Sequence, residues 1–323
     1  MSNQPPAYSI APRSGQQLSA PLVSIIVNCL NGEAYLAAAL DSALAQSFKD
    51  WELILYDDQS TDGSAEIFRS YADPRFRYIY AKQRLELTQA RDEAIRHSCG
   101  EWLAFLDQDD LWMPDKLERQ LDFLRQPGAD KVGLIYGRAK RFGYLDAGRD
   151  FDHHFEGQPL PEGDIFNRLA MEANFIPMSS SLVRRLALTE MDPVPQNIRL
   201  CPDYYYWMAI SQRWQVRALQ EPCCLYRVRS YDFTSYSGVQ IFTELLDIIE
   251  YFSRELDPRT LVKRRRACEN LIGIAEIASG RLLAGLNRIA RYGSVLHLIA
   301  RGPGYILRCL CDQLLHSKAK ESG

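Results

Sequence analysis

Two clusters of carboxylates each follow directly on a short apolar run of the sequence. The run at residues 51–56 leads into Asp57 and Asp58, and the run at 102–106 leads into Asp107, Asp109 and Asp110. Adjacent like charges are costly unless something positive joins them. A divalent cation such as Mg²⁺ binds one or two carboxylates and leaves other positions for substrate phosphates. Asp107 and Asp109, two residues apart in a loop, fit that demand, and we interpret them as candidate metal ligands.

A local explanation competes with this one, because Asp, Ser and Thr are favoured in loops and at helix N-caps. Asp62 and Ser64 fit that description. Two acidic clusters that each follow a strand-like run, and so would lie on one edge of the same sheet, favour a functional site over local capping.

The elements that must position these acids follow from hydrophobic periodicity. Short apolar runs predict strands, and apolar residues at helical spacing predict helices between them. Strands are expected at residues 22–27, 51–56, 77–81, 102–106, 132–136, 176–183 and 223–228. Helices are expected at residues 33–46, 64–71, 88–98, 114–125, 164–171 and 203–212. This alternation predicts an α/β fold with a mostly parallel sheet, whose ligand lies at the carboxyl ends of the strands.

The C-terminal part of the chain has a different character. Further helices are expected at residues 241–256, 261–279, 281–292 and 305–315. Residues 260–323 hold 11 Lys and Arg against 4 Asp and Glu, a balance of +7 within a chain whose net charge is −3. Apolar stripes between the basic residues predict amphipathic helices, which either lie on the inner face of a membrane or pack against a protein surface.

Several motifs together resemble family 2 glycosyltransferases. The resemblance is carried by residues 23–32, 42–48, 51–54, 57–64, 100–112 and 114–117, and it returns at Asp203 and at residues 225–227. It implies a GT-A fold and a nucleotide-sugar donor. It also implies an inverting transfer to a hydroxyl of a glycan or lipid-linked acceptor, in the synthesis of a cell-surface polysaccharide.

The same resemblance implies roles for individual residues. Asp58, together with Asp57, and Asn28 contact the nucleoside, whereas Arg91, Arg227 and Arg229 bind the donor. Asp107 and Asp109, with Asp110, hold Mg²⁺ or Mn²⁺ on the diphosphate of a UDP-, GDP- or dTDP-linked sugar. Asp203 is the catalytic base, although Pro202 replaces the first acid of the usual Glu-Asp pair. Asp at a helix start is also a common cap.

Two other functions remain open at this point. One is a non-catalytic sugar- or nucleotide-binding relative, for which Pro202 is the motivation. The other is a phospho-receiver-like α/β domain, which also carries an Asp-Asp pair after a strand. That domain, however, is shorter and needs a Lys at a later strand end.

The composition along the chain predicts its domain boundaries and its cellular compartment. We expect a flexible tail at residues 1–20, a catalytic domain at 21–238 and a basic helical region at 239–323. Within the catalytic domain, residues 21–137 form the donor half and 138–238 the acceptor half. The negative net charge argues against nucleic-acid binding. Eight cysteines without a CxxC pair, and no signal peptide or apolar span, predict a cytoplasmic protein that is soluble or peripheral at the inner membrane face.

Overall fold

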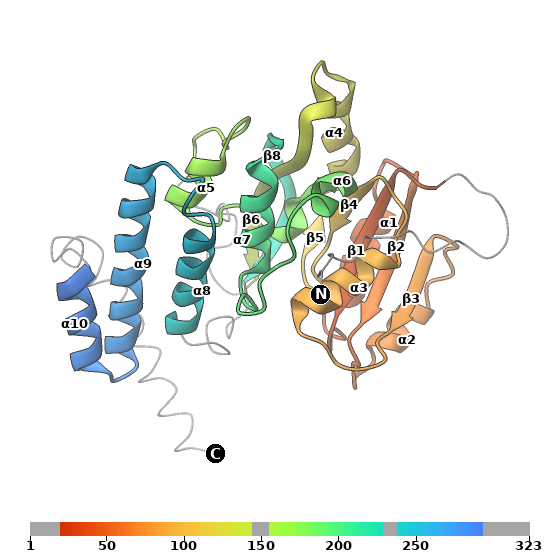
Figure 1. Ribbon diagram of the computed structural model, residues 1–323. Helices are drawn as coiled ribbons and strands as arrows, with labels where there is room; N and C mark the ends of the chain where they lie inside the picture. Colours follow the sequence, from red (N-terminus) through yellow and green to blue (C-terminus); the bar gives the residue numbers. More distant parts are fainter. Residues whose placement is uncertain (1–19, 144–154, 229–237, 293–323) are drawn as a thin grey trace, which may run out of the picture. The chain divides into compact units, whose positions relative to one another are not determined.

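The computed structural model describes residues 20–143, 155–228 and 238–292 (Figure 1). The chain divides into two compact units, Met1–Ser230 and Tyr231–Gly323. Three predicted features lie outside the described residues, namely the N-terminal tail up to residue 19, Arg229, and the helix expected at 305–315.

The first unit is built on one sheet with the strand order β3-β2-β1-β4-β7-β6-β8-β5. Its strands are β1 (Val23–Cys29), β2 (Trp51–Asp57), β3 (Phe76–Tyr80), β4 (Trp102–Phe105), β5 (Leu111–Trp112), β6 (Val132–Gly143), β7 (Leu182–Arg184) and β8 (Gln215–Val228). The pairs β1–β2, β2–β3, β1–β4 and β6–β8 are parallel. The pairs β4–β7, β6–β7 and β5–β8 are antiparallel. The predicted α/β class with a sheet flanked by helices is therefore confirmed.

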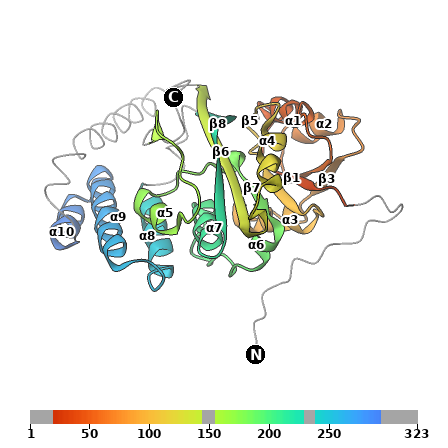
Figure 2. The same cartoon turned by 90° about the horizontal axis from the view of Figure 1, so that it is seen from above.

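Helices cover both faces of this sheet, as Figure 2 shows. One face carries α1 (Leu36–Leu44), α2 (Ser64–Arg69) and α4 (Lys116–Asp122). The other carries α3 (Leu87–Arg96), α6 (Arg185–Thr189) and α7 (Pro202–Ser211), and a further helix, α5 (Phe166–Glu172), packs on α7. The apolar stripe of α1 at Leu36, Ala39, Leu40 and Ala43 is fully buried, which is why this segment folds as a helix on the sheet.

One predicted strand is largely wrong. Residues 176–183 were expected to be extended, but Met178–Ser180 form a 3₁₀ turn, and β7 begins at Leu182. Two hydroxyls explain the turn: Ser180 donates to the carbonyl of Pro177 at 2.9 Å, and Ser181 donates to that of Met178 at 2.7 Å. Side-chain hydrogen bonds of this kind compete with strand pairing.

Other differences concern length. β6 and β8 run well past the apolar cores from which they were predicted, and they pair with each other from Val132 to Gly143. The two-residue strand β5 was not predicted, and it pairs with β8 through Leu111 and Leu225. That pairing draws the chain after the acidic loop toward the end of β8.

The second unit contains α8 (Gly238–Tyr251), α9 (Pro258–Ala278) and α10 (Leu282–Tyr292). Asp257 caps α9 by accepting the backbone N–H groups of Arg259 and Thr260, both at 3.0 Å. Helices α9 and α10 meet closely at Gly273, where a Cβ atom would come within 2.6 Å of Ile289. No helix among the described residues has both the length and the apolarity needed to cross a membrane.

Candidate active site

The end of β2 carries Asp57 and Asp58, and these two carboxylates have different surroundings. Asp57 is fully buried; its Oδ1 accepts the backbone N–H of Ser60 at 2.7 Å, and its Oδ2 accepts the hydroxyl of Tyr78. Asp57 thus ties the loop after β2 to β3. Asp58 accepts the N–H of Leu85 at 2.9 Å, and burial raises its pKa despite that hydrogen bond. Asp58 is therefore the better placed of the two to contact a ligand.

The acidic loop after β4 brings three predicted residues together. The backbone N–H of Asp107 donates to the hydroxyl of Ser179 at 3.0 Å, which anchors the start of the loop. Asp110 is 1% exposed, and one of its oxygens accepts the backbone N–H of Arg227 at 2.8 Å. Burial, and then the charges of Asp107 and Asp109, raise the pKa of Asp110 well above its usual range. A positive partner at this loop would relieve that unfavourable charge.

Arg227, at the end of β8, is held against this loop. Its Nε–H donates to the backbone carbonyl of Asp109 at 2.7 Å. Its guanidinium lies 4.3 Å from the ring centroid of Tyr35 and 4.2 Å from that of Phe142. Two aromatic rings and the loop therefore fix a cation beside the acids, where it suits a phosphate group.

Asp203 and Arg91 interact with each other from neighbouring helices. Asp203 lies in the first turn of α7, where its Oδ1 accepts the N–H of Tyr204 at 2.9 Å and its Oδ2 accepts the amide of Asn174 at 2.7 Å. Burial raises the pKa of Asp203, and the charge of Arg91 on α3 opposes that rise. The helix cap itself is Cys201, with Pro202 as the first helical residue. Asp203 therefore supports the helix start and carries a perturbed pKa as well.

Four buried polar atoms of this region have no hydrogen-bond partner. They are Nδ2 of Asn28, Oγ1 of Thr88, Nη1 of Arg91 and Oδ2 of Asp110. A buried polar group left without a partner costs about 1–3 kcal/mol, so such groups call for a ligand or water. Thr88 was not predicted as a site residue. Its position one helical turn before Arg91 is the signal that could have found it.

The carboxylates of the acidic loop suit a divalent metal only together with other ligands. Among the residues that the structure describes, no three His, Cys, Asp or Glu side chains are arranged to hold an ion by themselves. The buried Asp110 with its free oxygen, next to Asp107 and Asp109, instead fits a site with few protein ligands. Mg²⁺ sites of that kind are completed by water and substrate phosphates.

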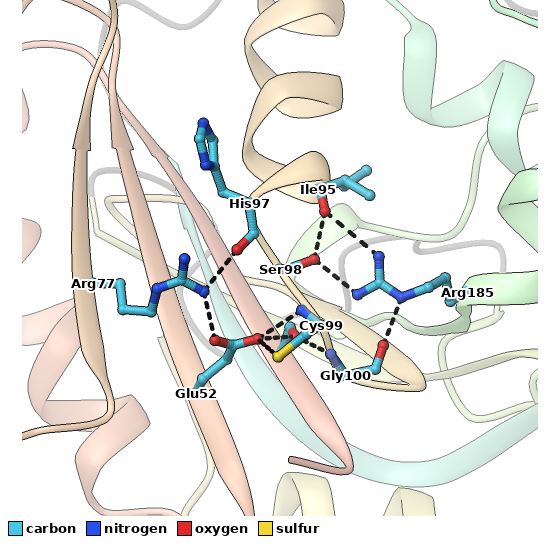
Figure 3. A network of polar contacts seen from close by, with 9 residues as sticks. Glu52, Arg77, Ile95, His97, Ser98, Cys99, Gly100 and Arg185 are labelled. Carbon is cyan, nitrogen blue, oxygen red and sulfur yellow. Dashed lines mark hydrogen bonds and ion pairs between the residues drawn. The ribbon is translucent and has the colours of Figure 1, made fainter. Parts of the chain in front are cut away.

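At the opposite edge of the sheet, a buried polar cluster holds α3 and β4 in place (Figure 3). We call it the Glu52 cluster; its central interactions join Ser24, Glu52, Arg77, Cys99 and Arg185. Glu52, on β2, accepts the hydroxyl of Ser24 and the backbone N–H of Cys99, both at 2.8 Å, and forms an ion pair with Arg77 at 2.9 Å. Burial alone would raise the pKa of Glu52, but hydrogen bonds, first those from Cys99, lower it to about 2.

The same cluster fixes the turn between α3 and β4. Arg77 also donates to the carbonyl of His97 at 2.7 Å. Arg185 donates to the carbonyl of Gly100 at 2.7 Å and to the hydroxyl of Ser98 at 2.9 Å. Gly100 also donates its backbone N–H to the hydroxyl of Ser24 at 2.7 Å. The segment 97–100 that follows α3 is thus bonded to β1, β2, β3 and α6, so the helix that carries Arg91 has a fixed position on the sheet (Figure 3).

Comparison with known proteins agrees with this architecture. The family model for glycosyl transferase family 2 matches residues 24–191, about half of the chain. The chain therefore belongs to glycosyl transferase family 2, which removes the phospho-receiver alternative. A mannosyltransferase of Pyrobaculum calidifontis, solved in complex with GDP-Man and Mn²⁺, superposes with a TM-score of 0.58. The identity is 19%, and the match covers 94% of this chain and 84% of that one, which supports the predicted GT-A fold.

Two bacterial relatives are similar in sequence. The putative teichuronic acid biosynthesis glycosyltransferase TuaG of Bacillus subtilis is 40% identical over 108 residues, 33% of this chain and 43% of that protein. WfgD of Escherichia coli, a UDP-Glc:alpha-D-GlcNAc-diphosphoundecaprenol beta-1,3-glucosyltransferase, is 26% identical over 216 residues. That match covers 66% of this chain and 80% of WfgD. The chain thus spans less than half the length of TuaG and most of WfgD.

Proposed function

We propose that this protein is an inverting glycosyltransferase. It moves a sugar from a nucleoside diphosphate to a hydroxyl of a glycan or lipid-linked acceptor during the synthesis of a bacterial cell-surface polysaccharide. The observation that carries the proposal is a set of acids with raised pKa in a family 2 chain, namely the buried Asp58 and Asp110 and the half-buried Asp203. The names of TuaG and WfgD support the polysaccharide context.

The donor would be held between the ends of β1, β2 and β8. We assign Asn28 and Asp58 to the nucleoside, with Asp57 positioning the loop that carries Asp58. Arg91 and Arg227 would bind the negative charge of the diphosphate; Arg229 has the same assignment and lies outside the described residues. The orphaned Nη1 of Arg91 and Nδ2 of Asn28 support this, because each is a buried donor that lacks an acceptor.

Asp107 and Asp109, with Asp110, would hold Mg²⁺ or Mn²⁺. When bound, the ion would neutralise negative charge on the departing diphosphate. The raised pKa of Asp110 supports this assignment, because a cation at the loop would stabilise its ionised form.

Asp203 would act as general base. The acceptor hydroxyl gives its proton to the Asp203 carboxylate while its oxygen bonds to the anomeric carbon of the donor sugar. The bond from that carbon to the phosphate oxygen breaks, and the nucleoside diphosphate leaves. A single base acting opposite the leaving group implies inversion. The hydrogen bond from Asn174 would hold one oxygen of the base in place.

Peripheral attachment to a membrane is proposed for the second unit. Helix α10 leaves Leu282, Leu283 and Leu286 exposed at 54%, 76% and 46%, next to the exposed Arg281 and Arg291. Exposed leucines beside basic residues are typical of a helix that lies in the interface of an anionic membrane. A lipid-linked acceptor would make such attachment useful.

The test combines binding and turnover. Thermal shift with UDP-, GDP- and dTDP-sugars in the presence of Mn²⁺ should identify the donor by a raised melting temperature. Asp107→Ala and Asp109→Ala should abolish donor turnover with the fold intact, whereas Asp122→Ala, an exposed acid on α4, should leave it unchanged. Full activity of both loop variants in EDTA-treated buffer would refute the metal site.

The Asp203→Asn variant and the turnover of the wild type distinguish an enzyme from a non-catalytic binding relative. Asp203→Asn should still bind the donor but lose at least about 10²-fold in transfer, the usual size of general-base catalysis. A wild-type protein that binds a donor but neither hydrolyses nor transfers its sugar would instead be a binding relative, as the replacement of the first acid by Pro202 allows.

A further inference from the structure

A concave site lies at the edge of the sheet opposite the acidic loop. It is a pocket of about 400 Å³ lined by Asp130, Lys131, Glu190, Arg213, Trp214 and Gln215, and we call it the Trp214 pocket. Val132 and Gln215, which pair at the starts of β6 and β8, place it at the amino edge. β6 and β8 run in the direction of β4, because β7 is antiparallel to both β4 and β6. The acidic loop follows the other end of β4, so the two sites are separate.

Trp214 is held in a fixed position in this pocket. Its ring packs on the backbone of Gly133, where a Cβ atom would come within 2.5 Å of Trp214 Cβ and 2.6 Å of Cγ. Its Nε1–H donates to Oε2 of Glu190 at 3.2 Å, and Arg213 donates to the carbonyl of Glu190 at 2.7 Å. A large side chain is thus fixed on a residue that has no side chain of its own.

Exposure sets Trp214 apart from the other tryptophans. The chain has five, and Trp51, Trp102, Trp112 and Trp207 are at most 4% exposed. Trp214 is half-buried and lines the pocket. A partly exposed, rigid aromatic ring costs little conformational entropy on binding and offers a flat apolar surface.

The rest of the lining defines the chemistry of the ligand. Two acids, Asp130 and Glu190, are balanced by two basic residues, Lys131 and Arg213, and Gln215 adds an amide. These lining residues have no excess of positive charge to attract a phosphate. The neighbouring Arg184, whose guanidinium lies 5.7 Å from the Trp214 ring centroid, donates to the backbone carbonyls of Ala129 and Asp130. The charged and amide groups beside the ring do not suit a wholly apolar peptide. A pyranose ring matches the pocket, since the apolar C–H face of the sugar stacks on an aromatic ring and its hydroxyls bond to planar polar groups.

We propose that the Trp214 pocket is a saccharide-binding subsite that holds a neutral stretch of glycan chain, with one sugar ring stacked on Trp214. Binding there requires neither the donor nor the acidic loop. That the bound chain is part of the acceptor rests on the proposed function. In that case the subsite raises the local concentration of acceptor through a second contact.

The test is ligand-observed saturation-transfer NMR on the full chain. The probes are four neutral tetrasaccharides built from glucose in α and β linkage, from N-acetylglucosamine and from mannose. At least one should receive saturation from the protein, and UDP should not displace it. Trp214→Ala should weaken that binding about tenfold, the size of one aromatic stacking contact. Glu66→Gln, at an exposed acid of α2 outside both sites, should bind the tetrasaccharide as the wild type does.

A second variant covers the case in which removal of the Trp214 ring disturbs the fold. Gln215→Ala leaves the ring on Gly133 and should still weaken binding measurably. Saturation of none of the four tetrasaccharides would overturn the proposal, as would equal binding by wild type, Trp214→Ala and Gln215→Ala. Displacement by UDP would assign the binding to the donor site, and displacement by inorganic phosphate would assign it to an anion site. Neither the NMR binding nor its dependence on Trp214 requires turnover. The outcome of this test is therefore independent of the glycosyltransferase assignment.

Discussion

Glu52→Gln should destabilise the protein substantially, although Glu52 is far from the acidic loop. The wild-type carboxylate accepts hydrogen bonds from Ser24, from Cys99 and, as an ion pair, from Arg77. Glutamine has the same shape but a single acceptor oxygen. Its amide can satisfy one side of the cluster and then presents N–H groups to the guanidinium of Arg77, so a buried acceptor is lost and two donors face each other.

The size of the loss follows from the pKa of Glu52. A fall from 4.5 to about 2 corresponds to about 3 kcal/mol of stability at neutral pH. The side chain of Arg77 is 35% exposed, so water screens part of the ion pair. We therefore expect Glu52→Gln to lower the free energy of unfolding by about 2 kcal/mol.

The pH dependence has a definite sign. Because the folded-state pKa is lowered, the stabilisation is complete above pH 4.5 and is lost as pH falls toward 2. The difference between wild type and Glu52→Gln should therefore be largest at pH 7 and should shrink below pH 4. Urea unfolding at several pH values, followed by circular dichroism, measures it.

The matched control is Glu66→Gln. Glu66 pairs with Arg69 at 3.7 Å, but both side chains are more than half exposed, at 72% and 61%. Its removal should cost less than about 0.5 kcal/mol. The reasoning would be refuted if both glutamine variants lost the same stability at pH 7, or if the effect of Glu52→Gln did not change between pH 7 and pH 3.

The remaining predictions concern the site and the second unit. Asp203 must be ionised to accept a proton, and the charge of Arg91 lowers its pKa. Arg91→Gln should therefore shift the acid limb of the pH profile of kcat/KM to higher pH, whereas Arg91→Lys should not. If the limb moves in neither variant, the charge of Arg91 does not control the ionisation of Asp203. Thr88→Val should raise the KM for the donor with little change in melting temperature, and Thr88→Ser should restore it; equal KM values would leave Thr88 without a donor contact. The full chain should float with anionic liposomes but not with neutral ones, and a chain ending near Asp257 should float with neither; equal flotation of both chains would exclude the second unit from membrane attachment.

The sheet and its main helices were predictable because their signals are local. The buried runs of β1, β2 and β4 are continuous and apolar, and α1 carries its stripe at helical spacing. Such patterns need no knowledge of the partner, since a fully buried strand looks the same in any parallel sheet. The predicted strand starts at residues 22, 51 and 102 agree with the structure within one residue.

The features that failed depend on contacts between distant segments. The turn at Met178–Ser180 depends on where two serine hydroxyls point, and β5 exists because β8 lies beside it. The different surroundings of Asp57 and Asp58 depend on Tyr78, which lies on a different strand and donates its hydroxyl to Asp57. Composition and spacing treat the two acids as equivalent, and the hydrogen bonds distinguish them.

The direction of the pKa shifts separates the acids that hold the fold from those available for chemistry. Glu52 is buried, yet hydrogen bonds from Cys99, Arg77 and Ser24 outweigh burial and lower its pKa. Asp58, Asp110 and Asp203 are also influenced first by burial, but their internal donors do not compensate for it, and their pKa is raised. An acid left in that condition makes the ligand-free protein less stable at neutral pH than it would be with the charge removed. If a cation or the donor binds there as proposed, it would relieve that cost, and the stability lost in the free protein would contribute to the affinity for the ligand.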